Sequence, residues 1–146
     1  MRIFQAMETS ASGLTAQRFR LDIIANNLAN ANTTRTAEGG PYRRQVAVFT
    51  TQRPSFSSLL SGAMRDGDFP GGVVVSSIEK DPRPPKLVYD PGNPDADPRG
   101  YVAMPNVDVV VEMVDMIAAT RAYEANITSI NAFKAMAAKA LEIGRG

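Results

Sequence analysis

The sequence predicts an α+β fold in which two long terminal helices pair as an antiparallel, coiled-coil-like hairpin around a small β-rich middle. Two observations support this prediction. All 10 prolines of the 146 residues lie between Pro41 and Pro105, so two proline-free arms enclose a proline-rich centre. Both arms repeat apolar residues every three or four positions, which is the spacing of a helical seam. We therefore expect a discontinuous helical domain of residues 1–40 and 104–146 and a β-rich module of residues 41–103.

The N-terminal arm, residues 3–32, is predicted to be a helix. Its heptad row consists of Met7, Leu14, Leu21 and Leu28, which follow one another at intervals of seven residues. Two residues depart from the pattern: Gly13, which costs a helix about 1 kcal/mol, and Arg18, where the pattern requires an apolar side chain. We expect the helix to be over by residues 33–40.

Four asparagines crowd the end of this helix, although asparagine competes with the helical backbone for hydrogen bonds. They are Asn26, Asn27, Asn30 and Asn32. One interpretation is a fraying, solvated helix end. The other is that Asn26 and Asn30, one turn apart, bond each other or the backbone of a neighbouring chain within a buried seam, as a single asparagine does in coiled coils.

The middle of the chain is predicted to hold three short strands, rich in β-branched and aromatic residues. They are residues 45–51, 73–78 and 86–89. The dipeptides at 66–67 and 71–72 are turn signals before the second strand, and residues 55–60 are expected to add a helical turn. So small a module, with prolines protecting its edges, is not expected to enclose a catalytic pocket.

The C-terminal arm, residues 108–143, is predicted to be one uninterrupted helix. Its seam was assigned to Val109, Met113, Met116, Thr120, Tyr123, Ile127, Ile130, Phe133 and Ala137. Alanines fill many other positions, and neither proline nor glycine occurs before Gly144. Such a helix would be roughly 50 Å long, whereas globular helices usually contain ~10–14 residues.

Two seams as long as the helices themselves predict contacts with other subunits, although a hairpin within an ordinary bundle remains an alternative. The predicted subunit-interface residues are Met7, Leu14, Leu21, Asn26, Leu28, Asn30, Met113, Met116, Tyr123, Ile127, Ile130 and Phe133.

Charge and composition argue against several functions. Basic and acidic residues number 4 and 3 in residues 1–40, 8 and 7 in 41–103, and 4 and 5 in 104–146, so we expect neither nucleic-acid binding nor a polybasic membrane patch. No apolar run approaches the ~18–20 residues of a membrane span, and the first 30 residues lack the apolar core of a signal peptide.

The chain also lacks the residues that most catalytic and metal sites need. It contains neither histidine nor cysteine, which excludes a Ser-His-Asp triad, a Cys-His dyad and a thiolate zinc site. Residues 93–97 imitate the start of a calcium loop, but Pro98 stands where the turn glycine belongs and Met104 where the bidentate glutamate belongs. We predict no enzyme activity, no cofactor and no metal.

Both ends of the chain resemble the signatures of bacterial flagellar rod and hook proteins. The N-terminal runs are SGLTAQ at 12–17 and RLDIIANNLANANT at 20–33, and the C-terminal runs are EMVDMI at 112–117 and RAYEAN at 121–126. The flanks of the middle resemble the proximal-rod, C-type branch of that family, with NTTRT at 32–36, GGPYRRQ at 39–45, DPGNPDAD at 90–97 and GYVAMPNV at 100–107. Many rod and hook relatives carry a glycine and an aromatic residue where this chain has Arg35 and Thr36.

The resemblance implies a structural subunit of the flagellar basal-body rod. Such a protein would be exported by the flagellar type III apparatus without a cleavable signal peptide. It would then join other rod proteins and copies of itself in a hollow periplasmic drive shaft, through its terminal helices. The alternative is a secreted or export-related helical binding module or chaperone, which would form a discrete complex instead of a polymer.

Overall fold

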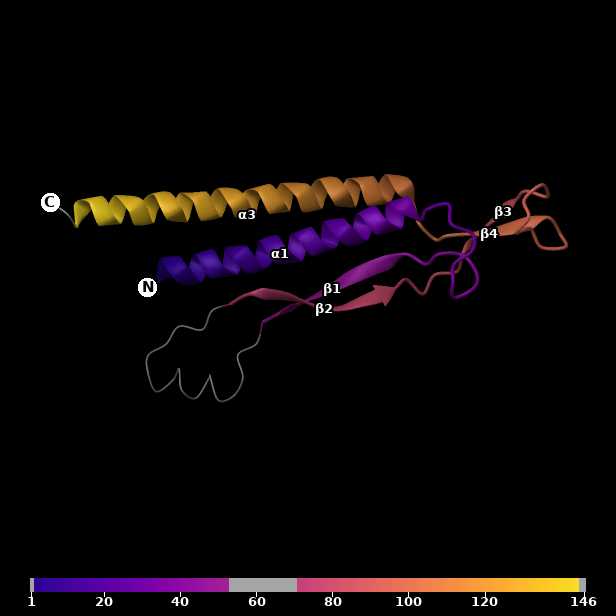
Figure 1. Cartoon of the computed structure of the whole chain (residues 1–146), viewed down its shortest axis with the longest axis horizontal. Helices are drawn as coiled ribbons and strands as arrows, with labels where there is room; N and C mark the ends of the chain where they lie inside the picture. The colour runs from indigo at the N-terminus through magenta and orange to yellow at the C-terminus, as the bar shows by residue number, and fades with distance from the viewer. Residues whose placement is uncertain (1, 53–70, 145–146) are drawn as a thin grey trace, which may run out of the picture.

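The computed structural model describes residues 2–52 and 71–144 and confirms the α+β fold (Figure 1). The elements are α1 (Arg2–Ala29), β1 (Gln45–Thr51), β2 (Val73–Lys80), β3 (Lys86–Tyr89), β4 (Tyr101–Met104) and α3 (Val109–Ile143). The molecule is elongated: α1 and α3 lie side by side, and the start of α1 and the end of α3 are at the same end.

Helix α3 begins where the sequence predicts, because Asp108 caps it. The Asp108 carboxylate accepts hydrogen bonds from the backbone N–H groups of Val110 at 2.9 Å and Val111 at 3.3 Å, with Asp108 itself in the extended conformation. Glu112 adds a negative charge in the first turn, where the helix dipole favours it. The 35 residues of α3 make a rod of about 52 Å.

The two helices run antiparallel in a defined register. Asn27 of α1 lies opposite Glu112 of α3, and Gly13 of α1 lies opposite Asn126 of α3. The two contacts are fourteen residues apart on each helix, so they share one register. On this register the first residue of α1 lies opposite position 137. The last residues of α3, 138–143, therefore extend past α1.

The contact face of α3 differs from the predicted seam by one residue at three of its eight positions. The side chains that are buried or half-buried at heptad spacing are Glu112, Met116, Ala119, Tyr123, Asn126, Ile130, Phe133 and Ala137. The predicted positions Val109, Met113, Thr120 and Ile127 are exposed in the single chain. The prediction followed apolar residues, whereas the row that faces α1 contains a glutamate, an alanine and an asparagine.

The small β-rich middle that the sequence predicted consists, in the described part of the chain, of two two-stranded antiparallel sheets. β1 pairs with β2, with an irregularity between Val48 and Phe49, and this hairpin packs along α1 on the side away from α3 (Figure 1). β3 pairs with β4 at the end of the molecule that is opposite the start of α1 and the end of α3. Strand β4 was not predicted, β2 is two residues longer than expected, and the expected turn at 66–67 and helical turn at 55–60 lie outside the described residues.

The fully buried apolar core is small and lies near the end of α1 and the start of α3. Its members are Ala16, Ile23, Ile24, Val102 and Ala119. Outside this core, many large apolar side chains of α3 are exposed, among them Val110, Val114 and Leu141. Much of the surface of α3 is therefore available to other molecules.

Candidate functional site

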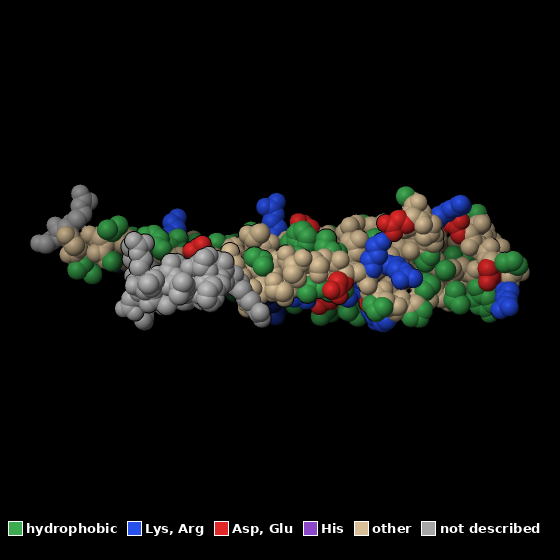
Figure 2. All heavy atoms as spheres, turned by 90° about the horizontal axis from the view of Figure 1, so that it is seen from below, with side chains coloured by type: hydrophobic (Ala, Val, Ile, Leu, Met, Phe, Trp, Pro, Cys, Tyr) green, Lys and Arg blue, Asp and Glu red, His purple; other side chains and the backbone are tan. Residues whose placement is uncertain are grey.

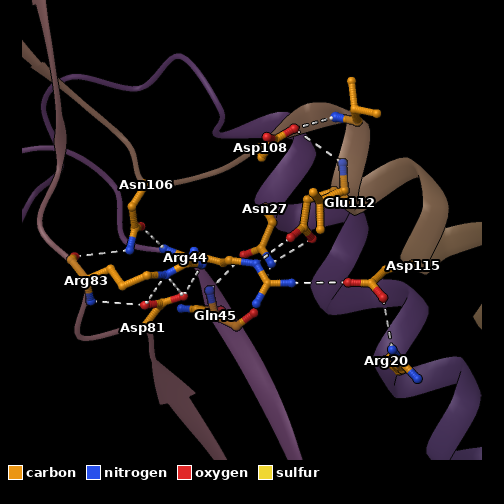
Figure 3. A network of polar contacts seen from close by, with 12 residues as sticks. Arg20, Asn27, Arg44, Gln45, Asp81, Arg83, Asn106, Asp108, Glu112 and Asp115 are labelled. Atoms are coloured by element: carbon orange, nitrogen blue, oxygen red, sulfur yellow. Dashed lines mark hydrogen bonds and ion pairs between the residues drawn. The ribbon is translucent and has the colours of Figure 1, made fainter.

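A cluster of polar side chains joins three segments where α1 ends and α3 begins (Figure 3). We call Asn27, Arg44 and Glu112 the junction. Asn27 comes from α1, Arg44 directly precedes β1, and Glu112 comes from the first turn of α3. Asn27 is 1% exposed and Glu112 is 0% exposed, so neither group can rely on water for its hydrogen bonds.

Asn27 uses all of its hydrogen-bonding capacity. Its Nδ2 group donates to the Gln45 carbonyl at 2.9 Å and to Glu112 Oε2 at 3.0 Å. Its Oδ1 atom accepts from the Gln45 backbone N–H and from the Tyr42 hydroxyl, each at 2.9 Å. One side chain thus holds the first residue of β1 and the first turn of α3.

Glu112 is a buried carboxylate with a charged partner. Arg44 Nε donates to Glu112 Oε1 at 2.5 Å, and Arg44 Nη2 donates to Asp115 Oδ2 at 3.2 Å. The second oxygen of Asp115 accepts from Arg20 Nη2 of α1 at 3.2 Å. Because the ion pair is desolvated, removing one partner should cost about 3–5 kcal/mol by leaving a buried charge uncompensated.

The junction also changes the titration of Tyr42. Burial raises the pKa of the Tyr42 hydroxyl above its ordinary value, and the negative charge of Glu112 raises it further. The hydroxyl therefore remains a hydrogen-bond donor to Asn27 at neutral pH.

A second set of contacts extends the junction toward β2 and β3. Asn106 Oδ1 accepts from the Arg44 backbone N–H at 2.9 Å, and Asn106 Nδ2 donates to the Arg83 carbonyl at 3.2 Å. The Arg83 guanidinium bonds Asp81, and these bonds lower the pKa of the Asp81 carboxyl to about 2. The backbone between the two sheets is thereby attached to the helix pair.

Farther along the helices, Gly13 and Asn126 are in close contact. A Cβ atom built on Gly13 would lie 3.2 Å from the amide of Asn126, which is closer than most real contacts of this kind. Asn126 is itself held in place, since its Nδ2 group donates to the Ala122 carbonyl at 2.9 Å. The glycine that weakens α1 as an isolated helix thus makes room for a polar side chain of α3.

The predicted interface residues fall into two groups in the single chain. The half-buried group comprises Met7, Leu14, Leu21, Leu28, Asn30, Met116, Tyr123, Ile130 and Phe133. The exposed group comprises Asn26, Met113 and Ile127. Asn30 Nδ2 donates to Asn26 Oδ1 at 2.9 Å and to the Asn26 carbonyl at the same distance, so these two asparagines do bond each other.

Sequence reasoning missed Asn27, Arg44 and Glu112, which form the best-connected polar group in the described residues. A signal was present for Glu112, which interrupts the apolar run of residues 109–114 one position before Met113. Asn27 has no such signal, because it lies in a group of four asparagines in which the spacing of one turn favours Asn26 and Asn30 as the pair.

Helix α3 carries a second apolar surface that faces away from α1. Val110, Val114 and Ile117 are 69%, 61% and 55% exposed. We call these three residues the outer stripe. Among the described elements α3 packs only against α1, and α3 forms the outermost layer of the molecule in Figure 1. An exposed stripe of this kind is typical of a protein interaction surface.

The hollows of the described surface offer no evident chemistry. The one at the junction, about 350 Å³, is lined by Arg20, Asn27, Arg44, Glu112 and Asp115, whose side chains bond one another. In the loop that imitates a calcium site, Asp97 Oδ1 instead accepts from the backbone of Arg99 and Tyr101. On the face shown in Figure 2, basic and acidic side chains are interspersed. No helix within residues 2–52 and 71–144 is long and apolar enough to cross a membrane.

Comparison with known proteins places these features in a family. Residues 7–35 match the family model "Flagella basal body rod protein", and residues 99–143 match "Flagellar basal body rod FlgEFG protein C-terminal". These two segments include most of α1 and all of α3, which hold the junction residues Asn27 and Glu112.

Full-length relatives carry the same description. The flagellar basal-body rod protein FlgC of Borreliella burgdorferi is 49% identical over 152 residues and covers 100% of both chains. The FlgC protein of Bacillus subtilis is 49% identical over 150 residues, covering 99% of this chain and 100% of its own. That of Salmonella typhimurium is 42% identical over 145 residues, with the same coverage. The chain belongs to the FlgC family of flagellar basal-body rod proteins and is a structural subunit of the basal-body rod.

Proposed function

We propose that the outer stripe of α3 docks onto neighbouring rod subunits, including copies of this chain, and that the long helix pair thereby becomes part of the wall of a hollow shaft. The observation that carries the proposal is the exposure of Val110, Val114 and Ile117 on α3. Among the described elements only α1 packs against α3, and it does so on the opposite face. A rod must transmit torque, and long interfaces resist torque because many apolar contacts must break together.

The distribution of exposed apolar side chains supports several such contacts. They lie along the whole of α3, from Val110 through Ile127 to Ile143, so more than one neighbour can contact the helix. An interface between different patches of the same chain generates a helical array when its rotation does not close into a ring, and such an array suits a tube. A discrete chaperone complex would leave most of this surface uncovered.

The test is a charge placed in the outer stripe. Val114→Asp puts a carboxylate at a residue that is 61% exposed. The isolated chain should therefore fold, with its free energy of unfolding changed by less than about 0.5 kcal/mol. In the rod that charge would be buried without a partner, so the strain should lose motility, and the protein should be absent from purified basal bodies.

The matched control is Ala132→Asp, which adds the same charge on the same helix at an exposed position outside the stripe. It should be incorporated and support swimming. A Val114→Asp strain that swims normally would show that the stripe does not dock. Ile130→Asp serves as a contrast, because Ile130 is half-buried on the face toward α1 and its change should destabilise the single chain as well.

We also propose that the chain reaches the periplasmic rod through the flagellar type III apparatus, without removal of a signal peptide. The first 30 residues carry Arg18, Arg20 and Asp22 within a folded helix, a pattern unlike the apolar core that signal peptidase substrates require. Intact mass spectrometry of the protein from basal bodies should find the residues next to Met1. A mature N-terminus near residue 20–30 would contradict the proposal.

A further inference from the structure

We propose that two contacts fix the register of α1 against α3: the hydrogen-bonded Asn27–Glu112 pair and the close approach of Asn126 to Gly13. In this role they are positioning residues for assembly, since the register sets how far α3 extends beyond α1. The register itself is a property of the single chain. Only its consequence for the rod rests on the docking proposed above.

The apolar residues of the helix pair do not define one register. Met7, Leu14, Leu21 and Leu28 recur every seven residues, so a slip of one heptad along α3 brings each leucine to the place of its neighbour. The slipped pair would lose only about 10 Å of overlap at one end. Alanine fills much of α3 and discriminates poorly between registers, because its side chain contacts so little.

The Asn27–Glu112 pair makes the slipped registers unfavourable. A slip in one direction places Asn27 opposite Ala119, which cannot accept a hydrogen bond through its side chain. A slip in the other direction places Asn27 opposite position 105, which precedes the start of α3. In either case Asn27 and Glu112 separate, and a polar group that is now buried at 0–1% exposure must find a new partner or remain unsatisfied.

The second contact lies two heptads away, about 21 Å along the helices. Glycine at position 13 leaves room for the Asn126 amide, because a Cβ atom at that position would lie 3.2 Å from the amide. Between the two contacts, the same register places Arg20 opposite Ala119, which is 0% exposed. At two of these three places a small residue of one helix thus faces a larger one of the other, as in packed cores that specify one arrangement.

The register has a direct consequence for the surface offered to neighbours. The end of α3 beyond α1 exposes Leu141 at 72% and Ile143 at 81%. A slip of one heptad would lengthen or shorten this end by about 10 Å and would move the outer stripe by the same distance relative to α1. A subunit in the wrong register could not match the spacing of its neighbours in a regular array.

Distance measurements between two spin labels test the register in the full chain. The protein contains no cysteine, so Glu8→Cys with Glu124→Cys provides two unique and exposed attachment sites. In the observed register, position 8 lies opposite 131, so the labels are one heptad apart along the axis. A slip in one direction removes this offset of about 10 Å, and a slip in the other doubles it. The otherwise unchanged chain should give a single distance.

Two variants should broaden that distribution. Asn27→Leu with Glu112→Leu replaces the polar pair by apolar groups, and a second distance shifted by about 10 Å is expected while helix content by circular dichroism persists. Gly13→Leu should act in the same way, and adding Asn126→Ala should restore one distance by making room. Asn26→Leu, which changes the exposed neighbour of Asn27, is the control and should give the unchanged distance.

The proposal is overturned if both the Asn27→Leu/Glu112→Leu chain and the Gly13→Leu chain keep the single original distance. If the double leucine variant loses its helix content, the Gly13→Leu variant and its rescue by Asn126→Ala carry the test alone. A merely structural role would lower stability without moving the distance. The outcome is independent of the motility of Val114→Asp, so failure of the docking proposal would be distinguishable.

Discussion

At the scale of single residues, the junction shows how one asparagine can organise a fold. Asn27 is 1% exposed, and its four hydrogen bonds reach the backbone at Gln45, the Tyr42 hydroxyl and the Glu112 carboxylate. Because the amide has two donors and two acceptor sites, no other side chain of similar size could make all of these bonds. Neighbouring Asn26 has an exposed side chain, and its Oδ1 atom accepts from Asn30, the first residue after α1.

Truncation at the junction should therefore have graded effects. Asn27→Ala leaves the Gln45 backbone groups and one oxygen of Glu112 without a partner, so we expect a loss of several kcal/mol in the free energy of unfolding. Tyr42→Phe removes one neutral hydrogen bond, so a loss of about 1 kcal/mol is expected. Urea denaturation of the purified chain measures both. Equal losses would show that Asn27 does not have the central role described here.

At the scale of elements, the sequence predicted the helices well because their signals are local. Asp108 with its cap, the alanine-rich run after it and the absence of proline up to Gly144 determine α3 without reference to the rest of the chain. Strands β1 and β3 were likewise predicted with the observed ends, Gln45–Thr51 and Lys86–Tyr89. Their β-branched and aromatic residues lie between prolines and polar turns, which limit a strand clearly.

Which face of each helix would be the contact face was less predictable. Apolar periodicity favoured the row of Met113 and Ile127, but the facing row contains Glu112, Ala119 and Asn126. Glu112 faces α1 because Asn27 and Arg44 provide partners for it, and Arg44 lies 68 residues away in sequence from Glu112. A contact between residues so far apart in the sequence produces no periodic pattern within either segment. Strand β4 was missed for a related reason, since its four residues are identified only by pairing with β3.

At the scale of the whole molecule, burial is unevenly distributed along the rod. Ala16, Ile23, Ile24 and Ala119 lie in the half of the helix pair that ends at the junction. In the described part of the other half, toward the start of α1 and the end of α3, the side chains are exposed or half-buried. The β1–β2 hairpin adds contacts to α1, including a hydrogen bond from the Thr9 hydroxyl to the Gly71 carbonyl.

This gradient predicts how the free subunit opens. Local opening requires little free energy where few apolar contacts break, so amides in residues 4–10 and 131–143 should exchange within seconds to minutes, while those in 20–29 and 112–123 should be protected longest. Hydrogen exchange followed by mass spectrometry compares the two ends in one experiment. Incorporation into the rod should slow exchange at 138–143 in particular, because neighbours would cover the end of α3 that extends past α1. Uniform protection along both helices of a free monomer would instead mean that the single chain stabilises its whole helix pair without neighbours, and the surplus surface would then need another explanation.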